Sequence, residues 1–209
     1  CGFDHYLVYT MEKAFQRETL KRWGIPLGKV VETLKFQNLE TETLVVPSWA
    51  DQSGFFDEGD VKRVREVLLA PELGKQSRFP KRFYIDRRKA AGRKISNWSE
   101  FAKVLEKHNY SIIELEGLGF SDQVQLFHNA EAVVGLHGAG LTNLLFCNAG
   151  TKVLELVNPN WCWWMYWNLA SSLNLNYHYL YSKVERQYCD KTMGNEADRR
   201  LQDLEIDTE

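Results

Sequence analysis

The sequence predicts an α/β protein whose C-terminal part is a doubly wound parallel sheet. From residue 82 on, short apolar runs typical of buried strands alternate with segments of helical periodicity, the pattern of successive βα units. Within this part, residues 132–159 predict a strand, a glycine turn, a helix, a second glycine turn and a strand. With 209 residues, of which 44% are hydrophobic, the chain can bury one complete domain plus part of another.

The first part of the chain predicts a smaller α/β unit. Residues 6–10 (YLVYT) have the composition of a strand, and residues 13–23 that of a helix ended by Gly24. Residues 29–31 and 43–47 predict two further short strands, so the order is β-α-β-β. We interpret this unit as the tail of a first α/β domain.

A helix over residues 59–69, ended by Pro71, precedes the expected domain boundary. The segment 71–80 holds two prolines, a glycine and several polar residues, which is typical of a linker. We therefore expect a partial N-terminal α/β domain over residues 1–75, a Rossmann-like domain over 76–186 and a charged, exposed tail over 187–209.

Five strands and four helices alternate across the second domain. The strands are expected at 83–86, 111–115, 132–136, 152–156 and 177–181, and the helices at 98–107, 122–129, 141–147 and 161–173. In a parallel sheet the strand-to-helix loops share one edge, so the loops that follow residues 86 and 136 are expected to converge there.

The turn His137-Gly138-Ala139-Gly140 has the features of an anion-binding loop. Three successive residues lack a side chain beyond Cβ, so backbone N–H groups can approach a phosphate where the next helix begins. The turn is a degenerate G-x-G-x-x-G with Asn143 in place of the third glycine, and the alternative is a purely steric strand-to-helix turn. Glu155, near the end of the following strand, is a candidate ribose ligand; the alternative is a strand-end residue facing water.

A second, cationic loop follows the strand at 83–86. Five cations lie between Arg87 and Lys94, ahead of a helix that Ser96 or Asn97 can cap. We expect Arg87 and Arg93 to approach the glycine turn, because arginine matches phosphate oxygens bidentately. For the remaining three cations we expect a solvated loop.

These segments resemble glycosyltransferase family 61, chiefly its bacterial members. The resemblance rests on residues 84–101 (YIDRRKAAGRKISNWSEF), 121–159 and 167–177, and its most specific part is HGAGLTN. Order and spacing agree from about residue 4 to residue 184. Carried over position by position, the donor-binding residues that the resemblance implies are Arg87, Arg93, Asn97, His137, Gly138, Ala139, Gly140, Asn143 and Glu155.

The resemblance implies a GT-B-like fold, with two facing Rossmann-type domains and the nucleotide sugar held mainly by the C-terminal one. It implies an inverting transfer from a nucleotide sugar, with a UDP-sugar expected, to a hydroxyl of a glycan or protein acceptor, for example in polysaccharide biosynthesis. No cofactor is implied. The chain enters the family pattern partway through the first domain, so we expect an incomplete acceptor-side domain and a general base outside or near the start of this segment. No catalytic residue is assigned.

Several other properties of the sequence argue against particular cofactors, partners and locations. No Asp-x-Asp motif is present, so arginines and the helix dipole are expected to neutralise the leaving group without a metal. The net charge of −2 argues against a nucleic-acid partner. No apolar stretch approaches ~18 residues, so no membrane span is visible in this segment. Four isolated cysteines make zinc unlikely to fit and favour a reducing compartment such as the bacterial cytoplasm, with an upstream leader or anchor left open.

The aromatic cluster Trp161, Trp163, Trp164, Tyr166 and Trp167 can stack on a sugar or base, but we expect it to pack in the core or at a domain interface. Two other function classes stay open. One is a non-catalytic nucleotide-binding remnant. The other is a dinucleotide oxidoreductase, which is disfavoured because two βα units precede the glycine turn. An esterase is weaker still, because no G-x-S-x-G motif is present.

Overall fold

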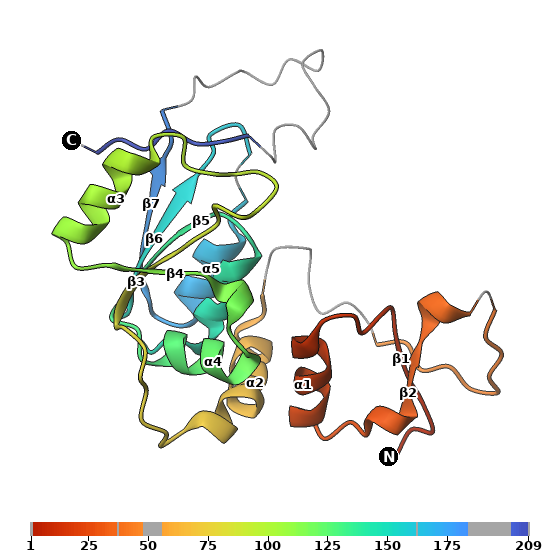
Figure 1. The fold of residues 1–209 in the computed structure, drawn as a ribbon. Helices are drawn as coiled ribbons and strands as arrows, with labels where there is room; N and C mark the ends of the chain where they lie inside the picture. Colours follow the sequence, from red (N-terminus) through yellow and green to blue (C-terminus); the bar gives the residue numbers. More distant parts are fainter. Residues whose placement is uncertain (1, 37, 48–55, 162, 184–201, 209) are drawn as a thin grey trace, which may run out of the picture.

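The computed structural model describes residues 2–36, 38–47, 56–161, 163–183 and 202–208. It is an α/β structure with a two-stranded parallel pair near the N-terminus and a five-stranded parallel sheet after it. Figure 1 shows these two sheets apart from each other, with helix α1 on the side of the small pair that is nearer to α2. The α/β class and the parallel sheet predicted from the sequence are confirmed.

The N-terminal unit is β1 (Tyr6–Val8), α1 (Ala14–Arg22) and β2 (Val30–Glu32), with short 3-10 turns at Leu27–Lys29 and Thr33–Lys35. Strand β1 pairs with β2 in parallel, as a β-α-β unit requires. The prediction of a strand at 43–47 is wrong, because these residues are described and form no strand. Their β-branched side chains favour extended backbone, but a strand also needs a hydrogen-bonding partner.

A buried ion pair joins this unit to the rest of the molecule. Helix α2 (Glu58–Leu69) is followed by a 3-10 turn at Ala70–Glu72. The guanidinium of Arg22, on α1, donates to Glu72 at 2.7 Å, to the carbonyl oxygen of Leu68 at 2.5 Å and to the hydroxyl of Ser121 at 2.6 Å. Because both charged side chains are almost fully buried, these contacts tie α1 to α2 and α4.

The large sheet has the strand order β4-β3-β5-β6-β7, with all neighbours parallel. Its strands are β3 (Arg82–Ile85), β4 (Ser111–Ile113), β5 (Ala132–Leu136), β6 (Lys152–Val157) and β7 (Asn176–Tyr181). Its helices are α3 (Trp98–Lys107), α4 (Phe120–His128) and α5 (Met165–Ser172), with 3-10 helices at Leu115–Gly117 (η4) and Ala139–Phe146 (η5). All five strands of the second part lie where the sequence predicts them, within two residues at their ends.

Side chains alternate between the two faces of this sheet. Phe83 and Val133 point into a core shared with α2, α4, η5 and α5. Tyr84 and Val134, one residue further along each strand, point into a second core shared with α3. The chain reverses direction along the sheet between α3 and α4, and right-handed crossovers then require these helices on opposite faces, as Figure 1 shows.

Two helices differ from the sequence prediction. The segment after β5 is a 3-10 helix that begins at Ala139, because the N–H of Leu141 bonds to the carbonyl oxygen of Gly138 three residues back. The helix predicted from residue 161 begins only at Met165. Residues 158–161 form a turn instead, in which the side chain of Asn158 accepts from the N–H of Asn160 at 2.8 Å.

The prediction of an exposed tail from residue 187 is wrong for the described residues 202–208. Leu204 and Ile206 are 1% and 2% exposed and belong to the core on the α3 face. Leu204 also forms a parallel bridge with Ile95. The segment has only polar or charged residues at its other positions, which is why its composition resembles that of a solvated tail although two alternate side chains are buried.

Candidate functional site

The candidate site lies at the carboxyl edge of the sheet, between β3 and β5. From β3 the chain crosses to β4 on one side, and from β5 it continues to β6 and β7 on the other side. Such a reversal is a topological switch point, where open α/β sheets bind their ligands. The cationic loop follows β3 and the glycine turn follows β5, so both are placed at this point.

Arg87 and Arg93 lie against Gly138. A Cβ atom placed on Gly138 would lie 3.0 Å from Nη1 of Arg87 and 3.5 Å from Nη1 of Arg93. The same Nη1 of Arg93 donates to the carbonyl oxygen of His137 at 2.6 Å. The prediction that these two arginines approach the glycine turn is confirmed. Gly138 therefore has a steric role, since its missing side chain leaves room for two guanidinium groups.

Two of the other cations of the loop, Arg88 and Lys89, have carboxylate partners. Arg88 donates to Asp86 from Nε and Nη2, at 2.9 and 2.7 Å to Oδ2, and its guanidinium lies 4.4 Å from the centre of the Trp98 ring. Burial raises the pKa of Asp86, but the hydrogen bonds from Arg88 outweigh it and leave the pKa lowered. Lys89, which is largely exposed, pairs with Glu114 at 2.8 Å. These pairs fit the expected solvated loop.

A buried polar chain runs across three neighbouring strands beside the arginines. Glu155, in β6, is 1% exposed. Its Oε1 atom is hydrogen-bonded to Nδ1 of His137, and its Oε2 atom accepts from the hydroxyl of Tyr177 in β7. The interpretation of Glu155 as a strand-end residue facing water is wrong, because the carboxylate is enclosed and both of its oxygens are engaged.

Two aromatic residues complete the surroundings of His137. Its ring meets Trp161 edge-on, with centroids 4.8 Å apart, and Tyr166 at 5.1 Å. The Cζ atom of Arg93 lies 5.2 Å from the centre of the Trp161 ring. Burial raises the pKa of Tyr166, so this side chain stays neutral at ordinary pH. Trp161 was expected to pack in the core or at a domain interface, although its position after β6, at the same edge of the sheet, is a signal that it lies at the site.

Two donor atoms of the site are buried without an acceptor among the described residues. They are Nε of Arg87 and Nε1 of Trp161. A buried donor without an acceptor costs about 1–3 kcal/mol, more for a charged group, so such atoms call for an explanation. Both lie in side chains that surround the His137–Gly138 turn, which points to a site that recognises an acceptor-rich ligand.

The remaining predicted residues have different surroundings. Ala139 is exposed, whereas Gly140 packs closely: a Cβ there would lie 3.1 Å from Leu115 and 3.3 Å from Ile85. Asn143 holds the turn from within, donating to Gln123 at 3.0 Å and to the carbonyl oxygen of Gly140 at 3.2 Å. The side chain of Asn97 is hydrogen-bonded to the backbone of Ile206 through both its Nδ2 and Oδ1 atoms.

Three of the tryptophans do not pack in the core, one of the two places expected for them, and their packing at a domain interface stays a prediction. Trp163, Trp164 and Trp167 are 43%, 52% and 49% exposed. Tyr166, between them in sequence, is the member of this segment that enters the core. Because α5 begins at Met165, the periodicity inferred for a helix from residue 161 does not apply to Trp163 and Trp164. Cys147 is buried, and burial raises its pKa to about 12.

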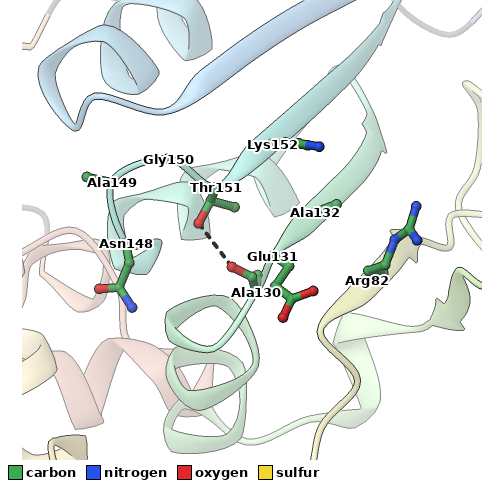
Figure 2. A pocket seen from close by; sticks show the side chains of 9 residues that line it. All are labelled: Arg82, Ala130, Glu131, Ala132, Asn148, Ala149, Gly150, Thr151 and Lys152. Atoms are coloured by element: carbon green, nitrogen blue, oxygen red, sulfur yellow. Dashed lines mark hydrogen bonds between the residues drawn. The ribbon is translucent and has the colours of Figure 1, made fainter.

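A pocket of about 500 Å³ lies at the opposite edge of the sheet. Figure 2 shows its lining residues, which come from the amino ends of β3, β5 and β6 and from the connections that precede β5 and β6. The hydroxyl of Thr151 donates to the carbonyl oxygen of Ala130 at 3.0 Å and closes one side of it. Since α/β sheets bind ligands at the carboxyl ends of their strands, this pocket is not the candidate site.

Among the residues that the structure describes, no group of three or more His, Cys, Asp or Glu side chains is placed to hold a metal ion. None of the helices in the described part of the chain has the length and apolar character needed to cross a membrane.

Comparison with known proteins shows that this chain matches a protein family. The model of the family Glycosyltransferase 61 matches residues 3–154, more than half of the chain. The EGF domain-specific O-linked N-acetylglucosamine transferase of Bos taurus is 38% identical over 71 residues, which are 32% of this chain and 14% of the relative. The proteins of the same name from Gallus gallus and Drosophila melanogaster are 39% identical over 74 residues and 35% identical over 78 residues. These matches cover 32% and 36% of this chain, and 13% and 15% of the relatives, so the chain spans only a small part of the curated relatives' length.

Proposed function

Because the chain belongs to glycosyltransferase family 61, we propose that the site between β3 and β5 binds the diphosphate of a nucleotide-sugar donor for glycosyl transfer. The observation that carries this proposal is the convergence of the Arg87 and Arg93 guanidinium groups on Gly138 at the switch point of the sheet. Two cations beside a glycine turn and the start of η5 suit a ligand with two adjacent phosphates.

The chemistry follows from the charge that develops on the donor. When the bond between the sugar and the diphosphate breaks, negative charge grows on the leaving group. Arg87 and Arg93 stabilise that charge, together with the dipole at the start of η5. We propose that the leaving group departs without a metal ion and that the anomeric carbon is inverted. The general base that activates the acceptor hydroxyl is not assigned to a residue of this chain.

Glu155 has an internal role in this proposal. Its carboxylate oxygens are engaged by His137 and Tyr177 and it is 1% exposed, so it supports the residue whose carbonyl oxygen holds Arg93. The ribose contact predicted for Glu155 would require one of these buried hydrogen bonds to be given up, at about 1–3 kcal/mol. We therefore leave the ribose without an assigned ligand.

The family and the names of its relatives suggest the partners to test. A nucleotide sugar, with a UDP-sugar as first choice, is the donor, and a glycan or protein hydroxyl is the acceptor. The relatives are named for N-acetylglucosamine transfer, so UDP-N-acetylglucosamine is the donor to try first. A GT-B arrangement would place the acceptor on a domain that faces the carboxyl edge of the large sheet.

Isothermal titration of residues 1–209 with UDP, uridine and inorganic diphosphate tests the proposal. We expect UDP to bind more tightly than uridine, because the arginines contact phosphate. Equal affinity for UDP and uridine, or no binding of either, would contradict it. A parallel assay for release of UDP from UDP-N-acetylglucosamine separates a transferase from a nucleotide-binding protein without catalytic activity.

A further inference from the structure

Arg93 is held in an unusual backbone conformation. Its φ is +58°, in the left-handed region that side chains with a Cβ rarely adopt. In this conformation its side chain reaches the carbonyl oxygen of His137. A strained residue at a binding site persists only when the structure around it fixes it, so the contacts that follow Arg93 in the chain carry functional information.

The residue after Arg93 is paired with the C-terminal segment. The carbonyl oxygen of Lys94 accepts from the N–H of Leu204 at 2.8 Å, and the N–H of Lys94 donates to the side chain of Asp203, also at 2.8 Å. The carbonyl oxygen of Leu204 accepts from the N–H of Ser96 at 2.8 Å. Residues 94–96 therefore form a short parallel bridge with Leu204, which fixes their position.

Asn97 extends this pairing by one side chain. Its Nδ2 atom donates to the carbonyl oxygen of Ile206 at 2.7 Å, and its Oδ1 atom accepts from the N–H of Ile206 at 3.0 Å. An amide that satisfies both backbone groups of one residue acts as a substitute for a neighbouring strand. Both apolar side chains of the segment, those of Leu204 and Ile206, are buried beneath α3, which fixes its register.

We propose that residues 202–208 form a C-terminal clamp that positions Arg93 for the donor diphosphate, and that Asn97 is the positioning residue that joins the clamp to the cationic loop. The inference rests on the proposed function of the site. Asn97 then acts on donor affinity through Arg93 and does not contact the donor itself.

The test compares Asn97→Ala with Lys183→Ala. The first substitution removes both hydrogen bonds to Ile206. The second removes the half-exposed ion pair between Lys183 and Asp207 but keeps the backbone hydrogen bond from Lys183 to Glu205. We expect Asn97→Ala to weaken inorganic diphosphate and UDP on the order of tenfold and to leave uridine unchanged, since the loss acts through a charge-assisted contact. Lys183→Ala should leave the affinity for all three ligands unchanged.

A double-mutant cycle distinguishes positioning from general destabilisation. In an Arg93→Ala background, Asn97→Ala should cause no further loss of diphosphate affinity, because the group that it positions is gone. A full additional loss in that background, or equal losses for uridine and diphosphate, would overturn the proposal. If Asn97→Ala fails to fold, Asn97→Ser, which shortens the side chain and adds no charge, should show the same phosphate-specific loss.

Hydrogen exchange gives a readout that does not depend on a ligand. Asn97→Ala should speed exchange of the amides of residues 87–97, whereas Lys183→Ala should not. If the wild-type protein binds neither UDP nor diphosphate, the proposed function fails. The clamp is then judged by exchange alone: faster exchange supports the structural link to Arg93, and unchanged exchange overturns it.

Discussion

His137 and Glu155 form a hydrogen bond inside the protein, between Nδ1 of the imidazole and Oε1 of the carboxylate. They come from the ends of different elements, His137 just after β5 and Glu155 within β6, and both are almost fully buried. The backbone carbonyl of the same histidine accepts from Arg93. A buried carboxylate therefore supports the residue that holds one of the two arginines that lie at the glycine turn.

The role of Glu155 can be separated from a ribose contact. Glu155→Gln offers only one acceptor where Tyr177 and His137 both approach, so we expect the free energy of unfolding to fall by about 1–3 kcal/mol. Uridine affinity should stay unchanged, because the side chain is internal. Tyr177→Phe is the matched control: it leaves one oxygen of Glu155 without its donor, so it should also lower stability by about 1–3 kcal/mol and leave uridine affinity unchanged. Reduced uridine affinity with unchanged stability in Glu155→Gln would show instead that the carboxylate binds the ribose.

The two arginines at Gly138 are expected to recognise phosphate and not the nucleoside. Arg87→Ala and Arg93→Ala should each weaken UDP by roughly 1.5–3 kcal/mol, the range for hydrogen bonds to charged groups, and leave uridine nearly unchanged. Calorimetric titration with both ligands measures the difference. Lys89→Ala, in the same loop but largely exposed and paired with Glu114, is the control and should change neither affinity by more than about 0.5 kcal/mol. Equal effects of all three substitutions would refute the assignment.

Nucleotide binding is expected to be independent of divalent metal. The chain has no Asp-x-Asp motif, and two guanidinium groups already lie where a diphosphate would need compensation. Titration with UDP in EDTA and in excess Mn²⁺ should therefore give the same affinity. A signal that is lost in EDTA and restored by Mn²⁺ would mean that a metal ion bridges the diphosphate.

The buried carboxylate of Glu72 makes stability depend on acid pH. Burial raises the pKa of Glu72, but hydrogen bonds from Lys75, Gln125, Ser121 and Arg22 outweigh it and lower the pKa to about 2, from 4.5. Because the folded-state pKa is depressed, the stabilisation is complete above the unfolded-state pKa and is lost as the pH falls from about 5 to about 2. The full effect is at most about 3 kcal/mol.

Urea unfolding at a series of pH values, for the wild type and Glu72→Gln, tests this dependence. The wild type should lose stability over that interval relative to the variant, which cannot titrate at this position. Parallel curves for the two proteins would show that Glu72 does not contribute to the acid sensitivity.

The elements of the large sheet could be predicted because their signals are local. The buried strand at residues 132–136 is recognised by its consecutive apolar side chains. The helix at residues 98–107 is recognised by apolar side chains at helical spacing. The glycine turn and the cationic loop were also visible as patterns of residue type. The prediction of a strand at 43–47 failed because β propensity is a property of one segment, whereas a strand forms only beside a hydrogen-bonding partner.

The contacts that make the site depend on the order of the strands. Only the placement of β3 beside β5 brings Arg87 to Gly138, and periodicity carries no information on which strands are neighbours. The partners of Glu155 come from two different segments, and the burial of Leu204 and Ile206 is hidden by the charged residues around them. Residue type and spacing along the chain thus predicted the strands of the large sheet, the glycine turn and the cationic loop, while long-range packing determined which side chains meet, because those contacts form between segments that are distant in sequence.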